Sequence, residues 1–558
     1  MRLPDSLFHL SNPFNVMNFP FVCREIRAAA VFFAILATPV AFAASAAWNV
    51  NNAGNWATAG SWNPAAAPGA TSGTSSTDIA TFGLAITGDR IVTVDTNRNI
   101  GGITFSNTSN FKYTLSGGSL LLSDTGVIQT ASGNGAHIDT ISTPITIQGD
   151  GTSATFSAKA TSASSVMNIG AVSGGSPAFS VTTLNLEGTN TGANTISGII
   201  SDGAPGAALA IVKSQAGTWT LSGANTHSGG TTIYDGMLIP TVAGALGTGF
   251  VMVDGSNTAI LSLGTANVTA GAVYLTSGKI DSTTGTLTGS SFTVQNGTIT
   301  AKLAGASADL TKSNLGTVIL TGANTYAGNT NVDDGILQVK TPGSLPGQTI
   351  SGKIRIATGA TLALNVGGAG EFTATDVANV LTNTFFSSGG FLGLDTTTTP
   401  STFTYSTTIA GTDKAIAKLG TGTLTLDGAA SNTHSGGTKV LAGTLTAGKT
   451  NALGTGPFTV DGNAAILNLG TFNQAVGTVS LGSNGGTING TGILTGSSFY
   501  LENGTISAKL AGSGGLSKIL TGMVTLSGAN TYTGGNLVSG GTLKPLLFLL
   551  FPAMTRPM

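Results

Sequence analysis

The residues of this sequence best suited to acid–base chemistry are a histidine and an aspartate two positions apart, His137 and Asp139. An imidazole beside a carboxylate can take up and release protons near neutral pH, which is the chemistry of a general acid–base site. The pair stands alone in the segment GNGAHIDTIS, without further acidic or basic side chains nearby. A lone pair of this kind is weak evidence for catalysis.

The two other histidines beyond residue 43 occupy one position of a repeated motif. His227 and His434 stand where two other copies of the motif have Tyr326 and Tyr532. A position that accepts either histidine or tyrosine does not select for a metal ligand or a proton carrier. We therefore interpret it as a half-buried corner residue of the fold.

Carboxylates are sparse and fall where turns are expected. Asp333–Asp334 is the only acidic pair in the motif, and Asp254–Gly255 and Asp461–Gly462 have the composition of ordinary turns. A calcium site needs several oxygen ligands at set spacing, and no such spacing occurs. The single cysteine, Cys23, excludes a thiolate zinc site, and no GxxxxGK(S/T) nucleotide loop is present. We predict no catalytic, cofactor-binding or metal-ligating residues, and no cofactor.

The composition points to a β-rich chain with a nearly neutral surface. Only 8% of the 558 residues are charged, and 22 Lys and Arg residues balance 23 Asp and Glu residues. A nucleic-acid partner is not expected, because phosphate binding needs a basic stripe. Apolar residues make up 41% and alternate with Thr and Ser, and 82 glycines interrupt the pattern. Alternation at period two predicts many short strands.

Residues 1–43 have the pattern of a secretory signal. Arg24 and Arg27 precede the apolar run AAAVFFAILATPVAFA, which ends in small residues. We expect cleavage after Ala43, with Ala46 as the alternative, and Met17 as an alternative start. The run is too short and alanine-rich to predict a membrane anchor, so no transmembrane helix is expected in the mature chain.

One short sequence recurs four times along the rest of the chain. Residues 316–339 read GTVILTGANTYAGNTNVDDGILQV, and close variants follow at intervals of about 100 residues. We name the copies motifs 1 to 4; they span about 213–240, 312–339, 418–446 and 518–543. A longer unit also repeats, because residues 245–264 match 452–470. Duplication at this scale indicates a repeat array rather than unlike domains.

Within a motif the alternation assigns side chains to two faces of a strand. In GTVILTG, Val318 and Leu320 share one face, and the threonines lie mostly on the other. The sequence Gly322-Ala323-Asn324 predicts a corner, since Gly and Asn tolerate positive φ. A second corner is expected at Gly335. Three short strands with one inward face predict a coil of a right-handed parallel β-helix, or β-solenoid, over residues 84–543. Antiparallel β-sandwiches of about 100 residues are the rival architecture.

Residues 44–83 differ from the array that follows. They contain three of the four tryptophans: Trp48, Trp56 and Trp62. A repeat array needs its open end covered. We interpret the segment as an N-terminal cap whose tryptophans pack on the first coil, with an exposed sugar-binding platform as the alternative.

The motif resembles the autotransporter-associated β-strand repeat, also called the passenger-associated transport repeat. The central signature is carried by Asn225-Thr226, Asn324-Thr325, Asn432-Thr433 and Asn530-Thr531. The resemblance implies a parallel β-helix passenger exported to the cell surface, in which the repeat assists secretion and folding and carries no known active site. It also implies a bacterial surface protein, adhesin-like, that is secreted or displayed on the cell, or periplasmic if outer-membrane translocation fails. Its partners would be a cell-surface or matrix polysaccharide or a protein, and its oligomeric state is left open.

The end of the sequence departs from that family. Autotransporters end in an outer-membrane β-barrel, and no series of amphipathic ten-residue strands is recognisable here. Residues 544–558 break the Gly/Thr alternation with a short apolar run, Leu546–Phe551. We interpret this tail as a truncated or frame-shifted reading frame. Two alternatives stay open: a glycan-active β-helix enzyme, either lyase or hydrolase, and a non-functional fragment.

Overall fold

The computed structural model describes residues 44–73, 75–131, 133, 135–148, 153–174, 181–545 and 554–555. The expected signal peptide, residues 1–43, lies outside the described residues, as does most of the expected aberrant tail, residues 544–558. Both assignments therefore remain predictions. The described residues all belong to one structural unit.

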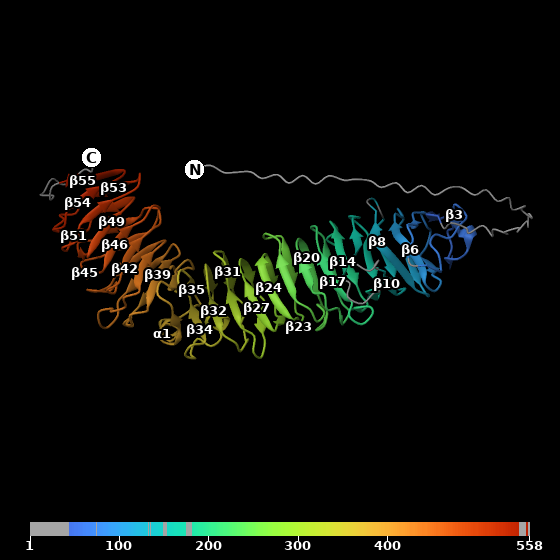
Figure 1. Ribbon diagram of the computed structural model, residues 1–558, viewed down its shortest axis with the longest axis horizontal. Helices are drawn as coiled ribbons and strands as arrows, with labels where there is room; N and C mark the ends of the chain where they lie inside the picture. Colours follow the sequence, from blue (N-terminus) through green and yellow to red (C-terminus); the bar gives the residue numbers. More distant parts are fainter. Residues whose placement is uncertain are drawn as a thin grey trace, which may run out of the picture. The chain divides into compact units, whose positions relative to one another are not determined.

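Successive coils of the chain lie side by side in parallel register, so the fold is a β-solenoid (Figure 1). Leu310 lies beside Thr330, and Thr330 lies beside Ile354 one coil further on. Backbone N–H and C=O groups of an inner coil can therefore pair with the coil before and the coil after. The expectation of an all-β parallel β-helix is confirmed. The rival sandwich architecture is wrong, because β1 (Ala46–Trp48) and β3 (Trp62–Asn63) are the only antiparallel strand pair among the described residues.

The three tryptophans near the N-terminus are buried against the first coil. Trp48, Trp56 and Trp62 are at most 1% exposed. Their rings surround Phe82 of β4 (Ile79–Phe82), with centroids 5.7–6.2 Å from its ring. A sugar-binding platform needs exposed rings, which these three tryptophans do not have. The assignment of residues 44–83 as a cap stays a prediction.

The coils before motif 1 contain longer strands than the rest of the array. The longer strands are β6 (Arg98–Phe105), β8 (Leu120–Thr130), β11 (Ser153–Ala160) and β14 (Val181–Gly188). The other elements of this part, including those of the first coil, are β2 (Gly54–Asn55), η1 (Ala59–Ser61), β5 (Arg90–Thr93), β7 (Tyr113–Ser116), β9 (Ile138–Ile141), β10 (Ile145–Ile147), β12 (Val166–Ile169), β13 (Val172–Ser173), β15 (Asn194–Ile196) and β16 (Ile200–Ser201).

Each motif starts at or near the end of one strand and contains three more. Motif 1 uses β17 (Ala208–Lys213), β18 (Thr218–Leu221), β19 (Thr231–Ile233) and β20 (Gly236–Pro240); motif 2 uses β30 (Leu310–Lys312), β31 (Thr317–Leu320), β32 (Thr330–Val332) and β33 (Ile336–Val339); motif 3 uses β39 (Ala415–Leu419), β40 (Thr423–Leu426), β41 (Gly437–Val440) and β42 (Thr444–Ala447); motif 4 uses β52 (Leu516–Lys518), β53 (Met523–Leu526), β54 (Asn536–Val538) and β55 (Thr542–Pro545).

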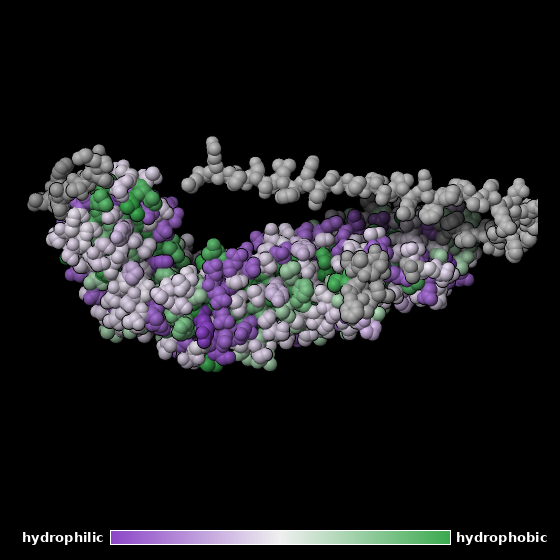
Figure 2. Space-filling model, in the orientation of Figure 1, coloured by the Kyte–Doolittle hydropathy of each residue, from purple (hydrophilic) through white to green (hydrophobic). Residues whose placement is uncertain are grey.

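The inward and outward faces expected within a motif are confirmed. In motif 2, Val318 and Leu320 are completely buried, while Thr317 and Ile319 are partly exposed. The equivalent inward residues are also buried; they are Trp219, Leu221, Leu424, Leu426, Val524 and Leu526. Threonine and serine dominate the outward positions, and the face of the protein in Figure 2 is mostly polar or weakly apolar.

Between the motifs the coils follow the same pattern. After motif 1 come β21 (Val251–Asp254), β22 (Ala259–Ser262), β23 (Val268–Thr269), β24 (Ala272–Ser277), β25 (Lys279–Asp281), β26 (Thr286–Thr288), β27 (Ser291–Val294), β28 (Gly297–Ile299) and β29 (Lys302–Ala304). After motif 3 come β43 (Phe458–Val460), β44 (Ile466–Asn468), β45 (Gln474–Ala475), β46 (Thr478–Leu481), β47 (Thr487–Asn489), β48 (Ile493–Thr495), β49 (Ser498–Leu501), β50 (Gly504–Ile506) and β51 (Lys509–Ala511). A last short strand, β56 (Met554–Thr555), pairs in parallel with β54.

A single α-helix among the described residues interrupts the array between motifs 2 and 3. The helix α1 (Ala374–Asn383) begins with a capping box, in which Thr373 and Asp376 each bond the other's backbone N–H. Its apolar side, including Val377 and Val380, is buried. The helix was not predicted from the sequence. It has a capping box at its start, but it is only ten residues long and lies in a region where the sequence pattern predicts strands. The elements around it are η2 (Pro342–Ser344), β34 (Ile354–Ile356), β35 (Thr361–Asn365), β36 (Phe385–Phe386), β37 (Phe391–Asp395) and β38 (Thr402–Tyr405).

The motif changes face across this helix. One continuous sheet contains β31 and β33 of motif 2, then β35 and β37, and then β39 and β41 of motif 3. The strand that corresponds to β31 in motif 3 is β40, which lies in a different sheet. The coil with the helix is also longer, because Arg355 pairs with Phe385, 30 residues later. The insertion therefore shifts motifs 3 and 4 by one face of the solenoid.

Within the described part of the chain, no helix combines the length and the apolarity needed to cross a lipid bilayer.

Replacing Leu320 by aspartate is expected to open the array locally. The side chain is completely buried between β28 and β33, so the substitution places a charge among apolar side chains and costs more than about 4 kcal/mol. Limited proteolysis should then cut near residues 300–340 while distant coils stay resistant, because coil interfaces contribute separately. The matched control is Thr317→Asp on the outward face of the same strand. Unchanged protease resistance of Leu320→Asp would contradict the inward assignment.

Candidate functional site

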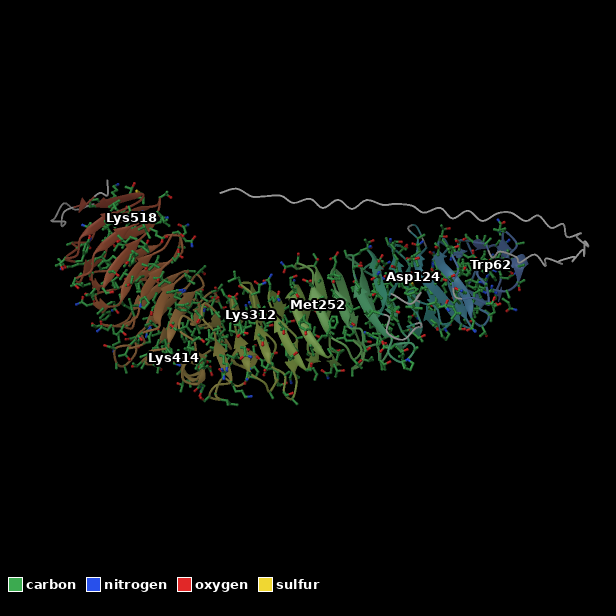
Figure 3. The ribbon with its side chains drawn as sticks, viewed as in Figure 1. Trp62, Asp124, Met252, Lys312, Lys414 and Lys518 are labelled. Atoms are coloured by element: carbon green, nitrogen blue, oxygen red, sulfur yellow. The ribbon has the colours of Figure 1, made fainter. Side chains whose placement is uncertain are left out.

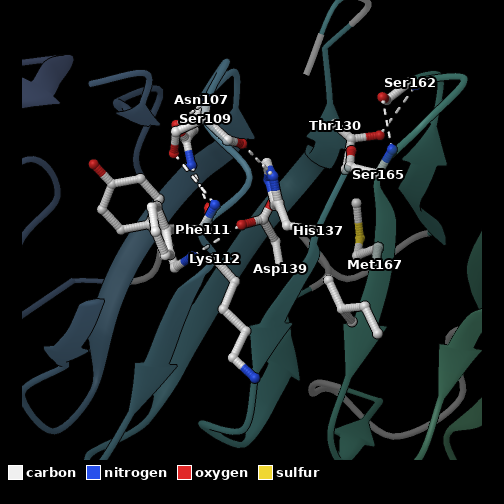
Figure 4. A network of polar contacts seen from close by, with 12 residues as sticks. Asn107, Ser109, Phe111, Lys112, Thr130, His137, Asp139, Ser162, Ser165 and Met167 are labelled. Atoms are coloured by element: carbon white, nitrogen blue, oxygen red, sulfur yellow. Dashed lines mark hydrogen bonds and ion pairs between the residues drawn. The ribbon is translucent and has the colours of Figure 1, made fainter. Parts of the chain in front are cut away.

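The histidine–aspartate pair singled out in the sequence is a buried contact between coils (Figure 4). His137 Nε2 lies 3.0 Å from Asp139 Oδ2, and Nδ1 lies 2.9 Å from the carbonyl oxygen of Ser109 in the preceding coil. The side chains of His137 and Asp139 are only 2% and 0% exposed. The other carboxylate oxygen accepts the backbone N–H of Tyr113 at 3.1 Å. Both ring nitrogens are engaged, so the imidazole has no free nitrogen to offer a substrate.

The charge of Asp139 favours the protonated form of the imidazole by raising its pKa. Burial by itself lowers the pKa of His137, but the hydrogen bond and the negative charge of Asp139 outweigh burial and hold that pKa above its ordinary value. A protonated imidazole donates from both nitrogens, which suits its two oxygen partners. The pair therefore links β9 and the residues just before it to the preceding coil through hydrogen bonds.

The shared His/Tyr position of the motifs is a fully buried corner, more buried than the sequence suggested. His227 and His434 are 0% exposed, and Tyr326 and Tyr532 are at most 5% exposed. Each side chain meets a polar side chain four residues later: His227 Nε2 lies 3.1 Å from Thr231, Tyr326 Oη 2.8 Å from Thr330, His434 Nε2 2.9 Å from Thr438, and Tyr532 Oη 2.7 Å from Asn536. A ring nitrogen and a phenol oxygen thus make the same contact.

Burial makes the two histidines hard to protonate. Desolvation lowers the pKa of His227 to about 4, although the charge of Asp202 opposes it, and desolvation likewise lowers the pKa of His434 to about 4. Both rings are therefore neutral at pH 7.

A lysine buried in every motif is the feature that the sequence analysis missed. Lys213, Lys312, Lys418 and Lys518 are each 0% exposed, and Figure 3 marks two of them. In motif 2 the ammonium group of Lys312 donates to the carbonyl oxygens of Ser313 (2.8 Å), Asn314 and Asp334 (3.0 Å). Ser313 and Asn314 follow the lysine directly, and Asp334 belongs to the next coil. The ammonium group is therefore enclosed by three carbonyl oxygens.

The same enclosure is built in the other three motifs. The acceptors are Ser214, Gln215 and Asp235 for Lys213; Leu419, Gly420 and Ala442 for Lys418; and Ile519, Leu520 and Gly540 for Lys518. The second acceptor in each motif has positive φ, which turns its carbonyl toward the lysine; these residues are Gln215, Asn314, Gly420 and Leu520. Burial lowers the pKa of Lys213 and Lys418 to about 8, which still leaves both groups charged at pH 7.

An asparagine in motifs 1, 2 and 3 links three coils. Asn324 Oδ1 accepts the backbone N–H of Leu303 in the preceding coil at 2.9 Å, and its Nδ2 donates to Ser344 O in the next coil at 2.8 Å. Asn225 and Asn432 make the same two contacts. Their amides supply hydrogen bonds where the chain turns between strands.

The expected reason for the Gly-Ala-Asn corner is wrong. Neither Gly322 nor Asn324 has positive φ. A Cβ at Gly322 would lie 2.2 Å from the carbonyl oxygen of Ala301, so glycine is needed because the preceding coil approaches too closely for any side chain. The second corner is as expected, since Gly335 has φ of 63°.

A polar cluster also lies beside the inserted helix. Gln338 donates to Asn365 and to Asp395, both at 2.9 Å, and Glu371 accepts the backbone N–H of Gly368 at 2.8 Å. The hydrogen bonds of Gln338 therefore link β33 to β35 and to β37. Among the described residues, no three His, Cys, Asp or Glu side chains gather closely enough to hold a metal ion.

Comparison with known protein families decides the identity of the motif. The family model of the passenger-associated-transport-repeat matches residues 211–239, 310–339, 416–447 and 521–544, which are the four motifs. The chain therefore contains four copies of the passenger-associated transport repeat. Each repeat, as matched, contains the lysine, the asparagine and the His/Tyr corner described above, except that the fourth match begins after Lys518.

The chain is also similar to part of an autotransporter adhesin. Over 263 residues the chain is 30% identical to the adhesin BmaC autotransporter of Brucella suis biovar 1 (strain 1330). The match covers 46% of this chain and 7% of that protein, so the chain spans only a small part of the relative's length. No solved structure matches the chain. The chain is thus an autotransporter-passenger-like β-solenoid.

A signal for the buried lysines was present in the sequence. The lysine keeps its distance to the following Gly-Thr or Gly-Met strand in all four repeats, as in TKSNLGTV and SKILTGMV. Alternation alone places it on the inward face with Leu310, two residues earlier. The expectation that charged residues lie outside hid this position.

Acidification is expected to destabilise repeats 1 and 3 selectively. The folded-state pKa of His227 and His434 lies below the unfolded value, so the unfolded chain binds more protons and stability falls as pH drops from about 6.5 to about 4. At pH 4.5 each histidine should cost on the order of 2–3 kcal/mol. The variants His227→Tyr and His434→Tyr, which copy Tyr326 and Tyr532, should reduce this loss. Urea unfolding or hydrogen exchange at pH 7 and pH 4.5 measures it.

The reciprocal variant is Tyr326→His, which should make repeat 2 acid-sensitive as well. An identical pH dependence for the wild-type chain and the two tyrosine variants would contradict the assignment.

Proposed function

We propose that this chain is an adhesive, non-enzymatic passenger that is secreted or displayed on a bacterial surface. The observation that carries the proposal is the four passenger-associated transport repeats together with the match to an adhesin autotransporter. The signal-like sequence of residues 1–43 supports export. The partner is a polysaccharide or a protein of a cell surface or matrix.

A specific surface suits an adhesive role. On the face formed by β17, β19, β21 and β24, a patch of outward apolar residues crosses successive coils; we name it the apolar strip, and it consists of Ala210, Val212, Phe250, Met252 and Tyr274. The parallel register places Met252 beside Tyr274, whereas the buried Thr232 separates Met252 from Val212 in the same row. Phe250 and Tyr274 are each 39% exposed, and their rings meet edge to face with centroids 6.3 Å apart. Exposed aromatic side chains with a polar edge are typical of recognition surfaces.

The duplicated half of the chain shows that the fold does not need these side chains. The residues that correspond to Phe250, Met252 and Tyr274 are Pro457, Thr459 and Ser480, as the repeated sequence and the strand register place them. Inward neighbours stay apolar in both halves, for example Val253 and Val460. An apolar outward residue kept in only one copy is therefore better explained by contact with a partner than by packing.

The enzymatic alternative gains no support from a particular cluster. His137 and Asp139 are buried and fully engaged. Two carboxylates of the polar cluster beside the helix, Glu371 and Asp395, each accept a hydrogen bond from the surrounding backbone. We therefore retain the adhesive role as the proposal.

The test of adhesion uses the second half of the chain as its template. The double variant Met252→Thr, Tyr274→Ser should lose at least about tenfold in binding, because it removes the exposed tyrosine ring beside Phe250 and the apolar side chain next to it. Its thermal unfolding should be nearly unchanged, since both positions face solvent. Binding is measured on immobilised polysaccharides, on matrix proteins and on whole cells.

The matched control is Tyr500→Ser, which removes a tyrosine that is 47% exposed on another part of the solenoid. Equal binding by the wild type, the double variant and the control would reject the apolar strip as the adhesive surface. Binding of the wild type to none of the three targets would count against adhesion itself.

A further inference from the structure

Each repeat connects neighbouring coils through side chains as well as through strand pairing. Lys312 donates to two carbonyl oxygens of its own coil and to Asp334 O of the next coil. Asn324 accepts from the preceding coil and donates to the next coil. One repeat thus ties three consecutive coils together through two side chains, in addition to the strand pairing.

We propose that each repeat is a latch whose carbonyl cage recognises a primary ammonium group, that its own lysine fills this cage, and that the latch closes only when the following coil is in place. The third acceptor comes from the following coil in all four repeats: Asp235, Asp334, Ala442 and Gly540. Without that coil the ammonium group has one N–H without an acceptor.

The number of donors fits the cage. A lysine ammonium group has three N–H donors and no acceptor, and the cage offers three carbonyl oxygens and nothing else of opposite charge within hydrogen-bond distance. A guanidinium group is planar with five donors in a rigid fork, which does not match three oxygens around one nitrogen, and an apolar side chain leaves the oxygens without a donor. The fourfold recurrence of the same geometry, on different sequences such as KSQAG and KLGTG, indicates that the cage is a built feature.

The four lysines are also the only ones among the described residues with no exposed surface. Other lysines of the array, such as Lys279 on β25, reach the solvent. The latches are thus confined to the repeats, about 100 residues apart. They divide the solenoid into segments that open separately, with the repeats as the most resistant coils.

Hydrogen exchange on the full chain tests the latch directly. The variant Lys312→Met keeps the length and the apolar stem but removes all three donors. Two backbone amides report on the latch. The N–H of Ile336 donates to Gly316 O, and the N–H of Leu303 donates to the side chain of Asn324. Their exchange should become at least about tenfold faster, while Thr444 of repeat 3 exchanges as before. The control Lys279→Met should change none of these amides.

Chemical rescue tests the ammonium specificity. In Lys312→Ala the missing atoms correspond to n-propylammonium, so millimolar n-propylammonium should restore the slow exchange of Ile336 and 1-propanol should not. If Lys312→Met does not fold, Lys312→Ala is folded with n-propylammonium and the amine is then dialysed away, which should release only the coils around repeat 2. Wild-type exchange in Lys312→Met, or equal effects of the amine and the alcohol, would overturn the proposal.

Discussion

The structure depends on the parallel stacking of one coil directly on the next. Strands in register lie about 4.8 Å apart, so each coil supplies the hydrogen-bond partners of its neighbours and leaves little room at the corners. The close approach of the Ala301 carbonyl to Gly322 shows how this spacing dictates residue type. The inward row of Val318, Leu320 and their equivalents follows from the same spacing, because apolar side chains fill the interior without needing hydrogen-bond partners there.

Much of this arrangement could be predicted from the sequence, since alternation fixes which side chains point inward. The three-strand coil, the buried Leu320 and the positive φ of Gly335 agree with the pattern. Lys312 was missed because the free energy of a buried charge depends on the carbonyl oxygens around it, and these come partly from a coil 22 residues away. The sequence shows the charged residue, but it does not show the three carbonyl oxygens that surround its ammonium group.

The inserted helix shows a second limit of sequence reasoning. Repeats 2 and 3 look alike as sequences, yet they lie on different faces of the solenoid because the coil from Arg355 to Phe385 contains ten extra residues relative to the one from Leu310 to Thr330. The face on which a strand lies depends on the lengths of all the coils before it, so the spacing between repeats does not predict that face. The hydrogen bond from Gln338 to Asp395 joins β33 and β37, which lie before and after this longer coil in the sequence.

The separation of inward and outward positions also explains how such a protein can acquire a binding surface. The His/Tyr corner tolerates exchange because Nε2 of His227 and Oη of Tyr326 reach the same hydroxyl partner, so the interior accepts only substitutions that preserve a contact. Outward positions have no such requirement, and Met252 and Thr459 occupy equivalent places in the two halves. Since stacking stabilises the coils whatever the outward row contains, that row is free to vary with the partner, and differences between the halves are most informative there.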